Sequence, residues 1–227
     1  IPEIVGFALL LNRPVEARIA KKYIRRCKQT LESRQMIKIG ITGSFGKTTV
    51  KNILTTILNQ KYNTYCTPAN YNTPMGICKA VNQLPKDCEI FVAEMGARKT
   101  GDIAELCEIV NPNHGIITGV GTQHLGVFKT RENIYNTKKE LADYVVKVGG
   151  KLVFNADNDL TLKMYRQFDY VGGSAVSDKE WLSSDSQENK ISISDAECVN
   201  DGLKFRLNIG KDSAVCESKL IGRHNLT

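Results

Sequence analysis

Hydrophobic residues along the chain follow two different spacings. Short β-branched runs, such as Met36 to Ile41, alternate as buried strands do, whereas Val50, Leu54 and Leu58 recur at the spacing of a helix. Strands are predicted at 36–42, 63–67, 88–94, 114–119, 151–155 and 168–172, and helices at about 14–33 and at 47–60, 75–83, 101–110, 131–147 and 158–166. This alternation predicts an α/β fold, a mostly parallel sheet with helices on both faces, whose ligands gather at the carboxyl ends of the strands.

The pattern changes near residue 174. Segments 190–194, 203–207 and 213–221 alternate with a period of two residues, and Asp201-Gly202 is a favourable turn between two of them. The polar stretch 183–189 is expected to be a loop. We therefore predict a small antiparallel β subsheet at about 174–221, close to the C-terminus of the chain.

A glycine-containing loop lies between the first predicted strand of the sheet and the helix that follows. Glycines let the backbone curve so that successive N–H groups face phosphate oxygens, and the N-terminus of the following helix attracts the same anion. Lys47 can then contact the outer phosphates and the Thr48 hydroxyl can ligate Mg²⁺. The usual spacing has a glycine where this chain has Ile41, and an ordinary strand-to-helix turn is the alternative. The order of strand, loop and helix favours a P-loop NTPase-like site for ATP. Its residues are Gly43, Ser44, Phe45, Gly46, Lys47, Thr48 and Thr49.

Positive charge is concentrated at the start of the chain. The net charge is +7, and residues 1–38 contain nine Lys or Arg against three Glu, so the remainder is nearly neutral. This distribution argues against a nucleic-acid-binding face. Ile4 to Leu11 is an apolar octet, which is too short for a bilayer because a spanning helix needs about 20 residues. It is either the end of a spanning helix with the basic stretch on its cytoplasmic side, or part of an amphipathic helix packed on the domain.

The seven cysteines are scattered, odd in number and without a Cys-x-x-Cys pair, so neither a disulfide framework nor a zinc site is indicated. A cytoplasmic location fits best, with the inner face of the membrane as a possible position through a tether preceding the chain. We expect a piece of a longer protein, because the chain begins at Ile1 and ends just after Gly222-Arg223-His224-Asn225. Residues 1–35 are expected to form a basic helical segment and residues 36–227 one ATP-binding domain.

Polar segments follow several predicted strands. They are Asn70-Tyr71-Asn72-Thr73-Pro74-Met75-Gly76, Glu94-Met95-Gly96-Ala97, Gly121-Thr122-Gln123-His124-Leu125 and, on the next helix, Lys138-Lys139-Glu140. Glu94 follows a hydrophobic run, and a carboxylate there is costly unless it meets a cation, so it is a natural Mg²⁺ ligand. Taken singly, His124 would be a loop histidine, Lys138 a solvated helix lysine and Asn72 a turn residue.

Together with the phosphate-binding loop, these segments resemble the Mur ligase family, ATP-dependent amide-forming enzymes of peptidoglycan synthesis. The resemblance covers about residues 36–227 and corresponds to the central ATPase domain. Glu94-Met95-Gly96-Ala97 looks like the branch that adds D-alanyl-D-alanine to UDP-N-acetylmuramoyl-tripeptide. Arg98 and Cys78 depart from that branch, which often has Asn and Pro at these positions.

The resemblance implies a role for each matched residue. Lys47 and Thr48 would hold phosphates and a first Mg²⁺ with Glu94, and His124 would ligate a second Mg²⁺. Lys138 would be carbamylated by CO₂, which requires a depressed pKa. Asn72 and Thr73 would contact substrate. Asn225 would meet the adenine, and Asn155 to Asp157 would line the nucleotide pocket.

The implied reaction moves the γ-phosphate of ATP to the tripeptide carboxylate, and the amine of D-alanyl-D-alanine then attacks the acyl phosphate. The family's amine-binding domain would follow this chain, and its UDP-sugar-binding domain is replaced here by the basic helix. We expect a monomer. Two alternatives stay open: another amino-acid-adding ligase of the folylpolyglutamate type, and a nucleotide-binding module without catalysis.

Overall fold

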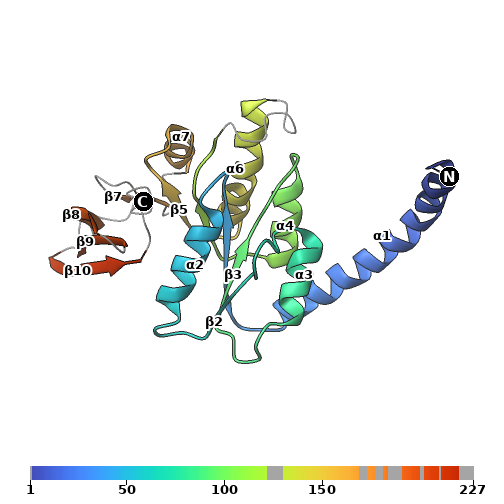
Figure 1. Cartoon of the computed structure of the whole chain (residues 1–227), viewed down its shortest axis with the longest axis horizontal. Helices are drawn as coiled ribbons and strands as arrows, with labels where there is room; N and C mark the ends of the chain where they lie inside the picture. Colours follow the sequence, from blue (N-terminus) through green and yellow to red (C-terminus); the bar gives the residue numbers. More distant parts are fainter. Residues whose placement is uncertain are drawn as a thin grey trace.

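The computed structural model describes residues 2–121, 130–168, 173–176, 181–183, 191–199, 202–209 and 211–219. Its centre is a sheet of seven strands in the order β2-β3-β1-β4-β5-β6-β7 (Figure 1). The strands from β2 to β6 are parallel, and β7 pairs antiparallel with β6 at the edge. Their bounds are β1 (Ile37–Thr42), β2 (Thr64–Cys66), β3 (Ile90–Glu94), β4 (His114–Ile117), β5 (Lys151–Asn155), β6 (Gly173–Val176) and β7 (Trp181–Ser183). The mostly parallel sheet predicted from the sequence is confirmed.

Helices cover both faces of this sheet, also as predicted. They are α2 (Lys47–Leu58), α3 (Pro74–Asn82), α4 (Asp102–Val110), α6 (Arg131–Lys147) and α7 (Asp159–Gln167). On one face, α2 packs Val50 and Leu54 against Ile41 and Val92. Alternate strand residues point to the other face, where the larger core joins α3, α4, α6 and α7. All five residues of β3 are buried, as expected for a strand between two helical layers.

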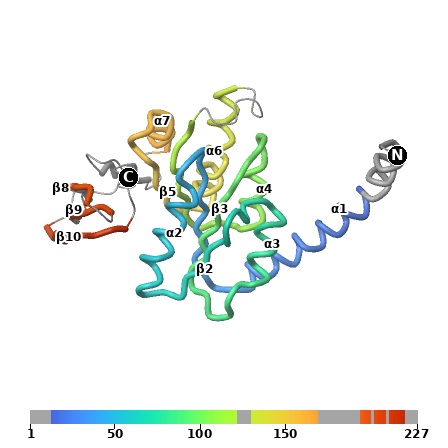
Figure 2. The backbone as a smooth tube through the Cα atoms, viewed as in Figure 1, coloured from blue at the N-terminus to red at the C-terminus, as the bar shows by residue number. Residues whose placement is uncertain are grey.

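The basic segment forms one long helix, α1 (Pro2–Glu32), which begins earlier than the predicted 14–33. Its last turns pack on the domain through Cys27 and Leu31, and burial of a side chain such as Leu31 contributes roughly 1.5–3 kcal/mol. Residues 13–19 are exposed, and α1 extends away from the sheet (Figures 1 and 2). No described helix is long and apolar enough to cross a membrane. Cys27 and Cys78 are both buried where α1 packs on α3, and Cys78 is the residue that departs from the family pattern.

The C-terminal strands form a separate antiparallel sheet in the order β10-β9-β8, on the side of the molecule opposite α1 (Figure 2). Its strands are β8 (Ile191–Val199), β9 (Gly202–Ile209) and β10 (Asp212–Ser218), so the predicted antiparallel subsheet is confirmed. Its predicted beginning near residue 174 is wrong, because β6 and β7 belong to the main sheet. Of the strand predicted at 168–172 only Phe168 is described, and it is the C-cap of α7; residues 169–172 lie outside the described residues, and a strand is described at Gly173–Val176. The three-residue β7 was not predicted, and most of the loop expected at 183–189 lies outside the described residues.

Candidate active site

The phosphate-binding loop joins β1 to α2 at the carboxyl edge of the sheet and packs on the end of β4. The Ser44 N–H donates to the Gly119 carbonyl at 2.7 Å, and the Thr118 hydroxyl donates to the Phe45 carbonyl. A Cβ on Gly43 would lie 2.1 Å from the Thr118 hydroxyl oxygen, so no larger residue fits there. Gly46 is the N-cap of α2 with φ +76°, a conformation that favours glycine. The neighbouring strand therefore fixes the curvature of the loop.

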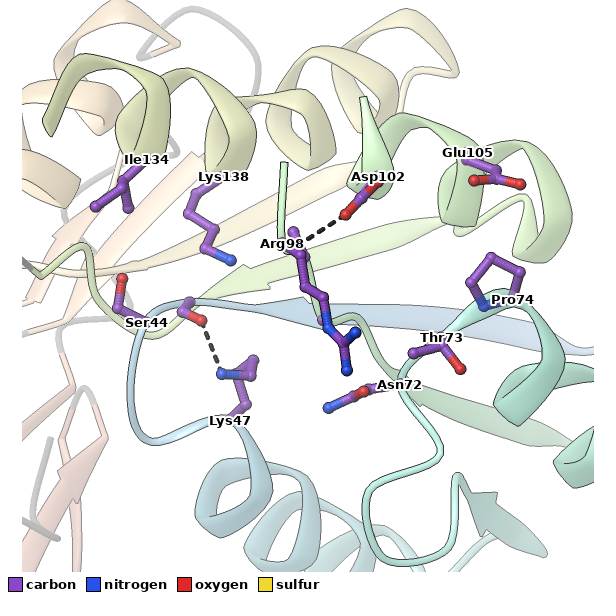
Figure 3. Close-up of a pocket in the computed structure, with 13 residues that line it drawn as sticks. Ser44, Lys47, Asn72, Thr73, Pro74, Arg98, Asp102, Glu105, Ile134 and Lys138 are labelled. Carbon is purple, nitrogen blue, oxygen red and sulfur yellow. Dashed lines mark hydrogen bonds between the residues drawn. The ribbon is translucent and has the colours of Figure 1, made fainter. Parts of the chain in front are cut away.

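Lys47 begins α2, and its side chain turns back over the loop. Its ammonium donates to the Gly43 carbonyl at 2.8 Å, as the dashed line in Figure 3 marks. Burial lowers the pKa of Lys47, and the nearby Glu94 carboxylate opposes this shift. An anion bound in the loop would meet this ammonium together with the backbone N–H groups at the start of α2. This is the arrangement that the sequence predicts for binding phosphate.

Glu94, the last residue of β3, is 2% exposed and is held by three side chains from other segments. The Thr48 hydroxyl donates to its Oε2 at 2.9 Å, and the Asn72 amide donates to its Oε1 at 3.1 Å. The Lys51 ammonium lies 3.3 Å from Oε2. A hydroxyl and a carboxylate are hard oxygen ligands of the type Mg²⁺ prefers, so these residues fit the ion that the sequence predicts.

Lys51 was missed by sequence reasoning. It lies one turn after Lys47 on α2 and is 1% exposed. The available signal was its position three residues before Leu54, on the helix face that packs against the sheet, where a lysine is rare unless it is paired.

Lys138 reaches the same space from α6, on the opposite side of the loop from α2 (Figure 3). It is 4% exposed, and no hydrogen bond or ion pair of its ammonium is found within the described residues. Burial, and then the nearby Lys47 charge, lower the pKa of Lys138 to about 8, against the opposing charges of Glu140 and Asp102. The low pKa that the resemblance requires of this lysine is therefore present.

Glu140, two residues further along α6, has a structural contact instead. Its two carboxylate oxygens accept the backbone N–H groups of Gly101 at 2.7 Å and Ala104 at 2.9 Å. Gly101 is the N-cap of α4 and has no side chain for capping, so Glu140 satisfies the N-terminus of that helix from outside. The Lys-x-Glu segment thus orients a lysine toward the cavity and anchors α4 against α6.

Lys47 and Lys138 line one cavity of about 490 Å³, together with Asn72, the hydrogen-bond partner of Glu94. Lining residues that bear on the chemistry are Ser44, Lys47, Asn72, Thr73, Arg98 and Lys138 (Figure 3). The Thr73 hydroxyl caps α3 by accepting the Gly76 N–H at 3.3 Å. Asn72 also lies close to Gly96. A Cβ atom on Gly96 would be 2.8 Å from the amide carbon of Asn72, which explains why a glycine is found two residues after Glu94.

Other predicted site residues lie apart from this cavity or outside the described part of the chain. The Asn155 amide donates to the Thr118 carbonyl at 3.0 Å, so it contacts the segment just after β4, beside the phosphate-binding loop. A second cavity, of about 820 Å³, is lined in part by Val120, Asp157 and Asn158. His124 and Asn225 lie outside the described residues, and their predicted roles stay predictions.

Comparison with known proteins agrees with this geometry. The sequence model of the family described as the Mur ligase middle domain matches residues 41–227. The chain belongs to the Mur ligase family. Over 130 residues it is 37% identical to the UDP-N-acetylmuramoyl-tripeptide–D-alanyl-D-alanine ligase of Synechocystis sp., covering 57% of this chain and 28% of that protein. The resemblance stated from the sequence motifs is thereby confirmed.

Solved Mur ligase structures have the same fold. A crystal structure of MurF from Acinetobacter baumannii superposes with a TM-score of 0.76 at 25% identity, covering 91% of this chain and 44% of that one. The MurF ligase of Thermotoga maritima in complex with ADP gives 0.75 at 25% identity, covering 91% and 46%. This Mur ligase chain thus spans less than half of the length of these relatives.

Burial of Lys138 in this Mur ligase domain predicts a stability effect. Below about pH 8 this lysine is protonated in both the native and the unfolded state, and the native state bears the cost of burying its charge. The cost disappears as pH rises from about 8 toward the unfolded pKa of about 10.4. We expect Lys138→Met, which keeps the aliphatic stem, to raise the free energy of unfolding by about 1–3 kcal/mol at pH 7 in CO₂-free buffer. The gain should shrink toward pH 10, measured by urea unfolding.

Lys139→Met is the matched control, because Lys139 is the adjacent lysine of α6 but is partly exposed and pairs with Asp143. That variant should be neutral or slightly destabilised. A Lys138→Met protein less stable than wild type at pH 7 would contradict a buried, unpaired charge.

Proposed function

We propose that the chain is the central ATP-binding domain of an ADP-forming ligase that joins D-alanyl-D-alanine to UDP-N-acetylmuramoyl-tripeptide. The observation that supports this most is the convergence of Lys47 and Lys138 on one cavity from two elements far apart in the sequence, with Glu94 hydrogen-bonded to Asn72 of its wall. The names of the relatives supply the substrates. Carboxylate activation by ATP suits a cavity with two lysines, because both ATP and the acceptor carboxylate are anionic.

In the proposed first step, the acceptor carboxylate oxygen attacks the γ-phosphorus of ATP, the bond to the bridging oxygen breaks, and ADP leaves. The loop N–H groups and Lys47 would hold the phosphates and stabilise the charge that spreads over the moving phosphoryl group. Thr48 and Glu94 would hold Mg²⁺, which neutralises phosphate charge when it is bound. The proposed roles of His124 at a second Mg²⁺ and of Asn225 at the adenine rest on the resemblance alone.

In the proposed second step, the amine of D-alanyl-D-alanine attacks the acyl carbon and inorganic phosphate leaves, with loss of one proton from nitrogen. Asn72 and Thr73 lie on the wall of the cavity across from the phosphate-binding loop, where an acceptor would enter. Arg98 exposes a cation on the same wall, at the position where the branch often has Asn. The acceptor carboxylate would thus approach between cationic side chains.

The experiment is phosphate release by the full-length protein with Mg-ATP and UDP-N-acetylmuramoyl-tripeptide, offered D-alanyl-D-alanine or L-glutamate in parallel. We expect release that depends on D-alanyl-D-alanine. Release with L-glutamate instead would favour an amino-acid-adding ligase of the folylpolyglutamate type. Nucleotide binding without turnover on either amine would favour a non-catalytic module.

We also propose a cytoplasmic location close to the inner membrane face and a monomeric state. Between residues 13 and 28, α1 has seven basic residues and one acidic one, and its exposed apolar side chains Val15, Ile19 and Tyr23 are spaced four apart. A basic amphipathic helix of this type suits an anionic lipid surface. The membrane tether and the monomer stay predictions.

A further inference from the structure

A buried ion pair between Lys51 and Glu94 lies directly behind the phosphate-binding loop. The two side chains are 2% and 3% exposed, with 3.3 Å between the ammonium and Oε2. Lysine and glutamate are almost never this buried unless they are paired, since removing a charge from water costs several kcal/mol. The reaction steps proposed above leave Lys51 without a role.

The geometry around the carboxylate suggests one. The Thr48 hydroxyl and the Lys51 ammonium both reach Oε2, whereas Asn72 takes Oε1. Thr48 and Asn72 are neutral, so within the described residues the one ion pair of Glu94 is with Lys51, and the Lys47 charge acts on the carboxylate from further away. The carboxylate is therefore compensated by a cation of the chain itself, without any metal ion.

Lys51 also connects this pair to the cavity wall. Its ammonium donates to the Ala69 carbonyl at 2.9 Å, and Ala69 has φ +40°, an uncommon conformation for alanine. The segment that follows contains Asn72 and Thr73. One ammonium therefore holds α2, the end of β3 and the loop before α3 in a fixed relation.

We propose that Lys51 is a positioning residue that serves as the resident counter-cation of Glu94 and keeps Mg²⁺ binding weak until nucleotide phosphates arrive. A divalent ion at Thr48 and Glu94 must share the carboxylate with the Lys51 charge, and the two cations repel each other. Anionic phosphates in the adjacent loop offset this repulsion. The ion would then enter together with the nucleotide, and free Mg²⁺ would not occupy the site. This inference rests on the metal role of Glu94 in the proposed function.

The test measures Mg²⁺ alone, by calorimetric titration and thermal melting of the full chain without nucleotide. Lys51→Met keeps the aliphatic stem and removes the charge. We expect it to melt at a lower temperature than wild type in EDTA, and to bind Mg²⁺ with a Kd on the order of tenfold lower, so that Mg²⁺ restores much of the lost stability. A merely structural lysine would lower the melting temperature by the same amount with and without the ion.

Two variants serve as controls. Lys51→Arg keeps the charge and should leave the Kd for Mg²⁺ near that of wild type. Lys79→Met removes an exposed lysine from α3 and should change neither quantity. An unchanged or higher Kd for Mg²⁺ in Lys51→Met overturns the proposal, as does a tenfold decrease in Lys51→Arg. If Lys51→Met does not fold alone, refolding with and without Mg²⁺ decides: recovery with the ion supports the proposal, and no recovery overturns it.

Failure of this inference can be told apart from failure of the proposed function. Combined with Lys51→Met, the Glu94→Gln change should abolish the effect of Mg²⁺ on melting, and an unchanged effect would remove the metal role of Glu94 and this inference with it. Neither titration uses ATP, tripeptide or amine. Tighter Mg²⁺ binding by Lys51→Met in a protein that shows no ligase turnover would thus leave the counter-cation role standing and reject only the ligase assignment.

Discussion

The Lys47→Ala variant is expected to lose ATP-dependent turnover by at least about 10²–10³-fold, the loss typical when one preorganised charge is removed from a developing anion. Lys47 is the cation that turns back over the phosphate-binding loop, and the other nearby lysines are differently engaged. Lys51 is paired with Glu94, and Lys138 lies across the cavity on α6. Neither can replace a point charge at the outer phosphates. Phosphate release by the full-length protein at saturating ATP measures the effect.

Folding should be nearly unaffected by this change, which makes the result interpretable. The hydrogen bond from Lys47 goes to the Gly43 carbonyl, which lines the open cavity and can be hydrated when the ammonium is gone. Lys61→Ala, an exposed lysine just beyond the end of α2, is the matched control and should keep wild-type turnover. Turnover within threefold of wild type in Lys47→Ala, with its melting temperature unchanged, would refute phosphate binding by this loop.

Local patterns in the sequence predicted the features of this site that depend on neighbouring residues. The strand, the glycine loop and helix α2 are contiguous in the sequence. The spacing of the apolar residues in α2 identifies the side of that helix that faces the sheet. The position of Glu94 followed in the same way, since a carboxylate at the end of a buried strand lies at the ligand-binding edge. Parallel pairing then brings Thr48 and Glu94 together, although they are far apart in the chain.

Features that depend on contacts between distant side chains could not be predicted in this way. The pairing of Lys51 with Glu94 needs the register of β1 against β3 and the depth of α2 on the sheet, neither of which is encoded locally. The capping of α4 by Glu140 is similar, since Gly101 gives no sign of an external cap. The edge strand β7 has three residues, too few for a period of two to be recognised.

Activity of the full-length protein should depend on dissolved CO₂ through Lys138, the second large effect we expect. We propose that the neutral Lys138 amine adds to the carbon of CO₂ and loses one proton, which gives a carbamate anion in the cavity. Only the neutral amine reacts. With a pKa of about 8, the neutral form accounts for about half of the Lys138 side chains at pH 8 and about a tenth at pH 7. Stimulation of a CO₂-depleted enzyme by added bicarbonate should therefore increase between pH 7 and pH 8.5.

The proposed carbamate would have a physical role in this geometry. A bare ammonium at Lys138 adds a second positive charge near Lys47 and is disfavoured by burial, whereas a carbamate reverses the sign and gains the attraction of Lys47.

Lys138→Ala should lose on the order of 10²-fold or more in turnover, because the anion that would hold phosphate and metal in register is gone. Short carboxylic acids such as acetate should restore part of that loss by placing a carboxylate in the vacated space. Lys139→Ala should behave as wild type. Intact-protein mass measurement under CO₂ that detects only the free amine, together with turnover indifferent to bicarbonate, would reject the carbamate and leave Lys138 as a cation that contacts the acceptor carboxylate directly.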